Sequence, residues 1–234
     1  MKLAIMQPYL FPYIGYFQLM HAVDRFVVYD DVNYIKQGWV NRNRILVGGA
    51  PHLFTMPLSE VSAFTHIDQL SLHGTAYPKW RDKFISTLRQ AYARAPFRGP
   101  VLGLVETVLP AGTTPLREVL LSGLQQVQTY IGASTVLIPT SRSFGNGQLH
   151  GADRVLDLCK REGAGTYVNA IGGKALYDKA AFKANGIDLC FLRTRPIEYA
   201  QGRHNFVPNL SILDVMMWNP PEQIGAWLGE YDLE

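Results

Sequence analysis

The segment 39–44 carries the most specific candidate binding chemistry in the chain. It reads Trp-Val-Asn-Arg-Asn-Arg, and together with Lys36 it holds three cations and no acid. Arginine grips a phosphate or carboxylate through paired hydrogen bonds, and amides suit sugar hydroxyls or base edges. If the segment is extended, alternation places the tryptophan and both asparagines on one side and both arginines on the other. A solvated edge strand protected by charge is the alternative. The residues that we predict to bind a ligand are Lys36, Trp39, Asn41, Arg42, Asn43 and Arg44.

A second candidate binding segment is the aromatic loop 7–16, Gln-Pro-Tyr-Leu-Phe-Pro-Tyr-Ile-Gly-Tyr. Its two prolines stiffen the backbone, and Gly15 lets a ligand approach the start of the helix that we expect there. Free N–H groups at a helix start favour a phosphate or carboxylate, and tyrosines can hydrogen-bond a phosphate or stack on a ring. The alternative is aromatic packing around a rigid turn. We predict that the ligand meets Gln7, Tyr9, Tyr13, Gly15 and Tyr16, the last as a candidate catalytic residue.

Two adjacent carboxylates, Asp30 and Asp31, follow the apolar run 26–29. Neighbouring side chains on a strand point in opposite directions, so at most one of them faces a given pocket. A magnesium ligand, a hydroxyl acceptor, a general base and an ordinary turn role are all open. We take both as catalytic candidates.

Three further loops add weaker candidates. Ser141 follows an expected strand, and Asn169 precedes the pair Gly172 and Gly173, whose amides could meet a ligand. No GxGxxG or Walker pattern is present, the six histidines are scattered without metal-ligand spacing, and no nucleophile elbow occurs. A hydrolytic triad and a metal site are therefore disfavoured. Ser211, with an acid three positions later, fits a helix N-cap better than a catalytic role.

The elements that position these residues alternate between strands and helices. Such alternation predicts an α/β fold with a mostly parallel, Rossmann-like sheet, in a single domain spanning 1–234 with a helical insertion at 76–131. In the insertion, Trp80, Phe84, Leu88 and Tyr92 recur at four-residue intervals, which indicates an amphipathic helix. The expected strands are 2–6, 26–30, 52–57, a short one near 67–72, 136–140, 167–170 and 189–193. One helix is expected to begin at Gly15. The other expected helices cover 77–94, 98–109, 115–131, 151–163, 176–185 and 211–229, the last broken at 219–221.

Composition sets the broad class. With 234 residues, of which 47% are hydrophobic and 18% charged, the chain can bury a large core. A net charge of +3 permits an anionic small molecule but is not the footprint of a nucleic-acid binder, so RNA binding by the basic face of 77–94 is the weakest alternative. The chain begins with the expected strand at 2–6, without the basic region and long apolar stretch of a signal peptide, so we expect none. No apolar run reaches the length of a membrane span. We expect a soluble, cytoplasmic protein whose two cysteines, Cys159 and Cys190, lie in the core.

The layout of the first 45 residues resembles the nucleotidylyltransferases that carry a His-x-Gly-His motif, such as pantothenate synthetase. Tyr13 and Tyr16 stand where that motif has its histidines. Histidine there stabilises charge on the leaving phosphate, so this departure argues against direct nucleotidyl transfer. The resemblance implies a nucleotidylyltransferase-like sheet, with a nucleoside triphosphate and Mg²⁺ as the candidate cofactor.

A second resemblance covers nearly the whole chain. The motifs that carry it are 5–9 with 12–17, Tyr-Asp-Asp-Val at 29–32, Lys36 with 39–44, Gly-Gly-Lys-Ala-Leu-Tyr at 172–177 and Asn-Leu-Ser-Ile-Leu-Asp at 209–214. In this order they are similar to the WbqC-like protein family, which is associated with bacterial O-antigen and other surface-glycan gene clusters. Many members have His-Gln-Pro and a tryptophan where this chain has Met6-Gln-Pro and Tyr13, and a thioether cannot carry a proton.

These resemblances imply an enzyme that acts on a nucleotide-activated sugar in surface-polysaccharide biosynthesis. Group transfer, such as acylation of an amino sugar, is the expected reaction, with Arg42 and Arg44 holding phosphates and Asp30 or Asp31 as base or metal ligand. The alternative is a non-catalytic nucleotide- or sugar-binding protein on a degenerate nucleotidylyltransferase-like fold. The expected partner is the small-molecule substrate. The sequence leaves the oligomeric state open, with a homodimer as one option.

Overall fold

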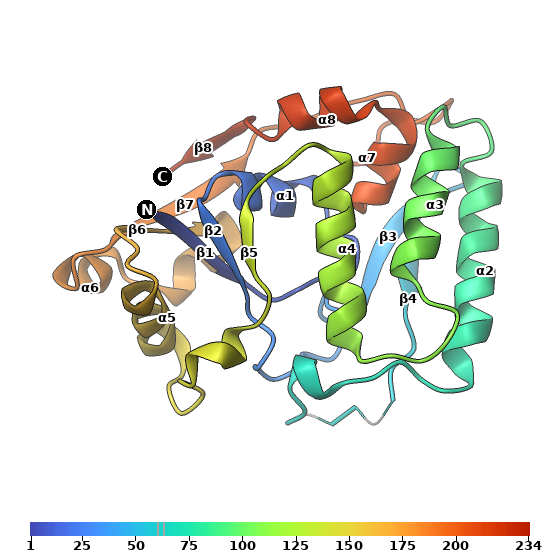
Figure 1. The fold of residues 1–234 in the computed structure, drawn as a ribbon. Coiled ribbons are helices and arrows are strands. Elements are labelled where there is room, and N and C mark those ends of the chain that lie inside the picture. The colour runs from blue at the N-terminus through green and yellow to red at the C-terminus, as the bar shows by residue number, and fades with distance from the viewer. Residues whose placement is uncertain (60, 63) are drawn as a thin grey trace.

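A six-stranded sheet forms the centre of the computed structural model, which describes residues 1–59, 61–62 and 64–234 (Figure 1). Its strand order is β5-β2-β1-β6-β7-β8, and every neighbouring pair is parallel except β7 with β8. The expectation of a mostly parallel α/β sheet is thus confirmed. The strands are β1 (Lys2–Met6), β2 (Arg25–Val28), β5 (Val136–Ile138), β6 (Thr166–Ala170), β7 (Asp188–Thr194) and β8 (Tyr231–Leu233).

The sheet is covered on both faces, as its apolar strands require. Successive side chains of β1 enter different clusters: Ala4 belongs to the larger core and its neighbours Leu3 and Ile5 to the smaller one. The larger core contains α1 (Ile14–His21), and the smaller one contains α5 (Gly151–Arg161) and α6 (Lys179–Ala184). The chain leaves β1 toward β2 and later returns to pair β6 with β1, so the strand order reverses between β1 and β6.

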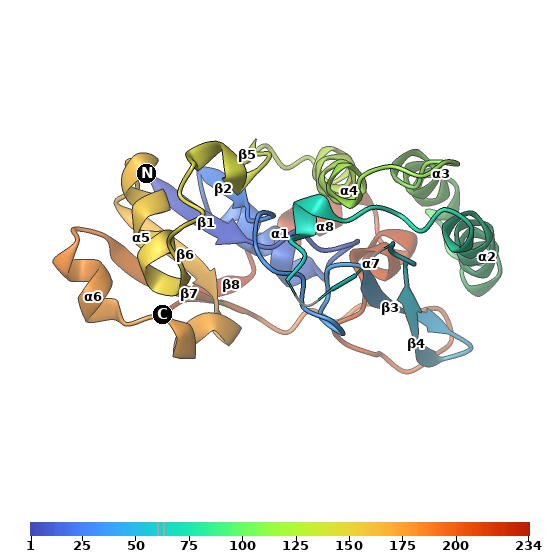
Figure 2. The same cartoon turned by 90° about the horizontal axis from the view of Figure 1, so that it is seen from below.

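The segment 76–131 forms three helices that lie together beyond one end of the sheet, opposite α5 and α6 (Figures 1 and 2). They are α2 (Ala76–Ala91), α3 (Arg98–Val108) and α4 (Leu116–Tyr130). The antiparallel hairpin of β3 (Arg42–Val47) and β4 (Ala50–Thr55) packs on them, with the rings of Phe54 and Phe84 4.5 Å apart. Helices α7 (Ile212–Trp218) and α8 (Pro221–Trp227) complete this side. That the segment is an insertion within one domain stays a prediction.

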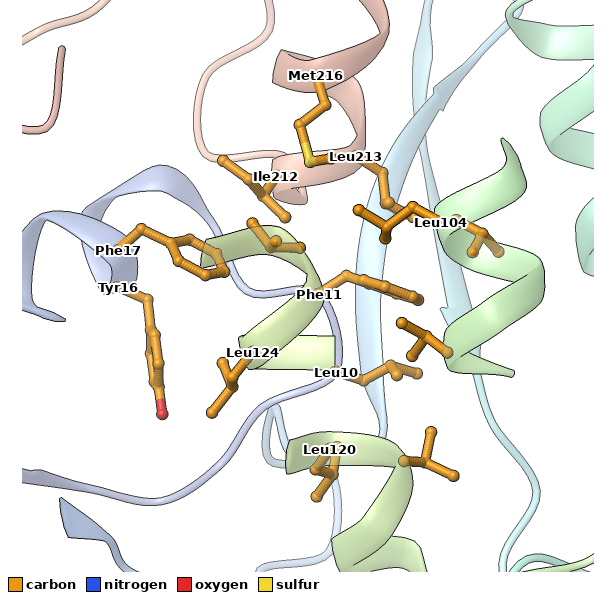
Figure 3. Packing of buried hydrophobic residues seen from close by; sticks show 14 of the residues in the cluster. Leu10, Phe11, Tyr16, Phe17, Leu104, Leu120, Leu124, Ile212, Leu213 and Met216 are labelled. Carbon is orange, nitrogen blue, oxygen red and sulfur yellow. The ribbon is translucent and has the colours of Figure 1, made fainter. Parts of the chain in front are cut away.

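The loop after β1 crosses the larger core. Leu10 and Phe11 point between α3, α4 and α7, against Leu104, Leu120 and Leu213 (Figure 3). Both residues are almost fully buried. The loop that the sequence marks as ligand-binding is therefore anchored by apolar side chains on its inner side.

The pair Gly48 and Gly49, both with positive φ, forms the turn of the β3–β4 hairpin. Two local expectations are corrected. The strand expected near 67–72 is wrong: a 3₁₀ helix covers Ile67–Gln69, and beyond it Ser71 and Leu72 make only isolated bridges. The helix expected from 176 begins at Lys179, since Asp178 accepts hydrogen bonds from the amides of Ala180 and Ala181. Among the described residues, the helices are all too short or too polar to cross a bilayer.

Candidate functional site

A cavity of about 310 Å³, here called the aromatic pocket, opens beside the loop that follows β1. In open α/β sheets ligands bind beyond the carboxyl ends of the strands, near the point where the strand order reverses. The pocket lies after one of the two strands that flank this point. Five residues predicted from the sequence meet in it, from two segments about thirty residues apart. The lining consists of Tyr9, Pro12, Tyr13, Trp39, Asn43, Arg44 and Asn209.

The loop that contributes Tyr9, Pro12 and Tyr13 to the aromatic pocket contains a strained residue. Phe11 has a φ of 44°, which a side-chain-bearing residue adopts at a cost of order 1–3 kcal/mol. Its carbonyl oxygen accepts hydrogen bonds from Asn43 Nδ2 at 2.8 Å and from Ser211 Oγ at 2.7 Å. Two segments distant in the sequence therefore hold one backbone group and fix the path of the loop. Asn209, across the pocket, also has a positive φ, 57°.

The indole of Trp39 lies between two guanidinium groups. The central carbons of Arg42 and Arg44 lie 5.6 and 5.7 Å from its ring centre, so both make cation–π contacts. The expected grouping of Trp39 with the asparagines, away from the arginines, is thus wrong, because Trp39 precedes β3 and folds back over its arginine side.

The two arginines differ in how their donors are used. Arg42 donates from Nε to Gly38 O at 2.8 Å and also to Gln37 O, so it closes the loop that precedes β3. Arg44 makes one long bond of 3.4 Å, from a terminal nitrogen to Asn209 O, and its Nε has no partner in the described part of the chain. Arg44, which lines the aromatic pocket, is therefore the arginine with donors left for an anion.

The asparagines of this segment are buried and bonded to the backbone. Asn41 accepts from Tyr34 Oη at 2.7 Å and donates to Met56 O at 2.7 Å. Asn43 supports Phe11 and also accepts from the Arg44 amide at 2.8 Å. Asn41 thus joins loop and hairpin, whereas Asn43 both supports and lines the pocket. Lys36 is exposed and is not among the lining residues.

Of the three tyrosines in the loop 7–16, two line the aromatic pocket and one lies in the core. Burial raises the pKa of both Tyr9 and Tyr13, so their phenols stay protonated near neutral pH and serve as hydrogen-bond donors. Tyr16 donates to Gln7 O at 2.9 Å and packs on Tyr9. Its complete burial is the main cause that raises its pKa well above the usual range. Its phenol faces core residues, and neither Tyr16 nor Gln7 is among the residues that line the aromatic pocket.

Gly15 is packed so closely that a side chain would collide. A Cβ added there would clash with the ring of Tyr13 and lie 2.6 Å from Thr194 Oγ1. The glycine thus allows Tyr13 to lie over the first turn of α1, where it walls the pocket. The predicted close approach is real, and the group that approaches is a side chain of the protein.

Asp30 lies at the carboxyl end of β2, fully buried. Its Oδ1 accepts from Thr140 Oγ1 at 2.7 Å and from the Ser141 amide at 3.2 Å. Its Oδ2 has no hydrogen-bond partner among the described residues, and Arg117 Nε lies 4.0 Å away. Burial is the main cause that raises the pKa of this carboxyl group.

Asp31 points to a different partner. Both its carboxylate oxygens accept from Arg154, at 2.7 and 2.6 Å, and Ser141 Oγ donates to one of them. Because Arg154 is itself buried, the pair is a desolvated ion pair. A magnesium ion at Asp31 would have to displace this arginine. Neither aspartate is among the residues lining the aromatic pocket.

The remaining candidates lie at other strand ends. Ser141 is buried between the two aspartates. Asn169 accepts from the Ala170 amide at 2.7 Å, and its Nδ2 lies 2.8 Å from where a Cβ of Gly173 would be, so that glycine makes room for it. Gly172 is exposed in the 3₁₀ helix Ile171–Leu176. The structure does not bring these residues into the aromatic pocket.

One residue that lines the site, Asn209, was not predicted from the sequence. Asn209 lines the aromatic pocket and also a neighbouring cavity of about 480 Å³, here called the apolar pocket, which shares Tyr13 with it. The signal that could have found it is the motif 209–214, which begins at Asn209. Among the described residues, no acid or histidine lines the aromatic pocket, and no group of three His, Cys, Asp or Glu is placed to hold a metal ion.

The chain is similar to known proteins over nearly all of its 234 residues. The sequence profile of the WbqC-like protein family matches residues 7–226. The uncharacterized protein Rv1507c of Mycobacterium tuberculosis is 28% identical over 236 residues, which cover 98% of this chain and 96% of that protein. No solved structure matches the chain.

Proposed function

The chain belongs to the WbqC-like protein family, which is linked to surface-polysaccharide gene clusters, and from this premise we propose that it acts on a nucleotide-activated sugar. The observation that carries the proposal is the aromatic pocket, which Trp39, Tyr9 and Tyr13 line together with Arg44. Aromatic faces stack on bases and sugar rings, and a guanidinium with unused donors suits a phosphate. Both features are what a nucleotide sugar needs.

The proposed reaction is group transfer, such as acylation of an amino sugar. Support for a nucleotidylyltransferase-like, Rossmann-like arrangement comes from the strand order and from the ligand loop that follows β1. Asp30 is the proposed base, because it keeps an oxygen without a partner in the described chain and its raised pKa suits proton transfer. A substrate would have to extend from the aromatic pocket along the strand ends to reach it.

A specific observation favours the alternative of a non-catalytic binding protein. Among the described residues, those that line the aromatic pocket include no carboxylate and no histidine, and both tyrosines hold their protons. Such a pocket binds a ligand but offers no base at the point of binding. The two functions therefore differ in whether Asp30 reaches the substrate.

Calorimetric titration with nucleotide sugars, and with nucleoside triphosphates with and without Mg²⁺, tests the binding step. Arg44→Ala should weaken nucleotide-sugar binding by about 10- to 100-fold, because a hydrogen bond to a charged group contributes about 1.5–3 kcal/mol. Arg89→Ala is the matched control, since that arginine pairs with Glu106 on the surface of the helical segment. The absence of binding across both ligand sets would refute the proposal.

Turnover separates the two functions. Mass spectrometry of an amino-sugar nucleotide incubated with acyl donors detects an acylated product. If the protein is an enzyme, Asp30→Asn should abolish that product and leave nucleotide-sugar affinity unchanged, since Asp30 is not among the pocket-lining residues. If no donor gives product while binding persists, the non-catalytic function is correct.

A further inference from the structure

The apolar pocket borders the aromatic pocket and is walled by the chain that follows β7. The two cavities share Tyr13 and Asn209. We propose that they form one cleft, and that the apolar pocket binds an acyl or alkyl group of the ligand whose phosphate lies at Arg44. This inference rests on the proposed function for the phosphate end only.

The apolar character of the second cavity is the first observation behind this assignment. At about 480 Å³ it falls within the usual size of small-molecule sites. Most of its wall is hydrocarbon, contributed by residues that are only partly buried or exposed in the structure and would lose water contact when a chain enters. The apolar wall includes Ile14, Pro196, Ile197, Phe206 and Pro208.

The charges around the apolar pocket argue against a second anion site. Arg195, the cation among its described lining residues, donates to Asp232 at 2.5 Å and to Glu230 at 3.4 Å, so its charge is compensated by two acids of the β8 region. Glu198, the acid among these lining residues, is exposed and would repel a phosphate. By contrast, Arg44 forms no ion pair with an acid in the described part of the chain and supplies a cation on the other side of Tyr13. The cleft is therefore polarised, with an anion-binding end and a hydrocarbon end.

The wall of the apolar pocket is held rigidly although it is irregular chain. Residues 195–211, all described, form no helix or strand between β7 and α7. Such long irregular connections are commonly functional. The buried carboxylate of Asp214 accepts from Tyr199 Oη at 2.7 Å and from Gln201 Nε2 at 2.8 Å, and Gln201 Oε1 accepts from the Val207 amide at 2.7 Å. The cavity is thus formed before a ligand arrives, which lowers the entropy cost of binding.

Tyr13 is the partition between the two ends of the cleft. It is held over α1 because Gly15 leaves room for its ring, and Thr194 also lies against this glycine. A ligand that fills both ends must pass this phenol, whose protonated hydroxyl is available to donate a hydrogen bond at the junction. The proposed ligand is therefore a phosphate-bearing molecule whose acyl or alkyl group begins near Tyr13.

Calorimetry with a series of alkyl phosphates, from methyl to hexyl, tests the cleft. Affinity for the chain of residues 1–234 should rise about two- to fourfold per methylene added, as hydrocarbon transfer from water predicts. Arg44→Ala should weaken every member by the same factor and keep this slope. Ile197→Asn should flatten the slope. Ile35→Asn, an exposed isoleucine outside both cavities, is the matched control and should change neither quantity.

The outcomes separate the two proposals. A flat chain-length series with intact methyl phosphate binding overturns the apolar subsite and leaves the proposed function standing. If no phosphate binds, the anion end of the proposed function fails, and a series of neutral 1-alkanols decides the apolar end alone. Alkanol affinity that rises with length and is lost in Ile197→Asn supports the subsite, whereas flat or absent alkanol binding overturns it. Thermal unfolding of each variant shows that it is folded.

Discussion

The carbonyl group of Phe11, a residue with a strained φ, gives the sharpest test of what fixes the path of the loop 7–16. Asn43 and Ser211 both donate to this one oxygen, from β3 and from the N-cap of α7. Either donor alone leaves the buried carbonyl with a partner. Removing both leaves it without one, at a residue whose φ of 44° depends on its surroundings. The two substitutions Asn43→Ala and Ser211→Ala should therefore be strongly coupled.

The magnitude follows from the hydrogen bonds that each change removes. Ser211→Ala loses one bond to Phe11 and a helix cap, and should cost about 1–2.5 kcal/mol. Asn43→Ala loses its bond to Phe11 and its bond from the Arg44 amide, and should cost about 1–3 kcal/mol. The double variant adds the penalty of a buried, unpaired carbonyl and should exceed the sum by about 1–2 kcal/mol. For a chain of this size that excess corresponds to a melting temperature lower by about 2–8 °C.

Urea unfolding of the four proteins, followed by circular dichroism, measures the free energies that this cycle needs. A second cycle that pairs Asn41→Ala with Ser211→Ala is the control, because Asn41 bonds Met56 and Tyr34 and shares no acceptor with Ser211. The control cycle should be additive within about 0.5 kcal/mol. If the Asn43–Ser211 cycle is equally additive, the shared carbonyl does not hold the loop, and the reasoning is refuted.

Two further predictions concern packing and charge. Gly15→Ala should displace Tyr13, destabilise the protein by about 1–3 kcal/mol and weaken nucleotide-sugar binding in calorimetry. Gly103→Ala is the control, because its added Cβ meets nothing within 4 Å on the exposed side of α3. This substitution should instead stabilise the protein by about 0.5–1 kcal/mol. Equal effects at both glycines would contradict the close packing. Burial raises the pKa of Asp214, so its contribution to stability is fully present below the unfolded pKa of about 3.9 and is lost as pH rises through the folded value. The stability of the wild type relative to Asp214→Asn should thus fall with rising pH above about 4 and then level off, and a rising difference in urea unfolding would refute this.

Much of the sheet could be predicted because strands and helices carry their burial pattern in the sequence. The run 2–6 became β1 at the expected residues, and the four-residue spacing of Trp80, Phe84 and Leu88 became α2. The strand β8 was not predicted. It is three residues long, at the edge of the sheet, and two of its residues are exposed, so it shows no apolar pattern.

The site could be predicted only in part, because a side chain's role depends on partners that the sequence does not reveal. The asparagines at 41 and 43 were predicted as ligand groups because of their type. In the structure their amides bond to Met56 O and Phe11 O, and backbone carbonyls have no signature in a sequence. The cap predicted at Ser211 is confirmed by its contact with the Leu213 amide, since capping acts over only two or three residues.

Arg42 and Arg44 show the difference between a role that local sequence can predict and one that it cannot. They are two residues apart on one strand, point to the same indole and have identical chemistry. Arg42 is used by carbonyls four and five residues earlier, contacts that a local turn makes. Among the described residues, the Arg44 guanidinium bonds only to Asn209 O, 165 residues later, at 3.4 Å, so its other donors are left unpaired there. The capacity of this pocket to bind an anion is therefore set by how closely a distant turn packs, and this distance is a property of the fold that no local pattern encodes.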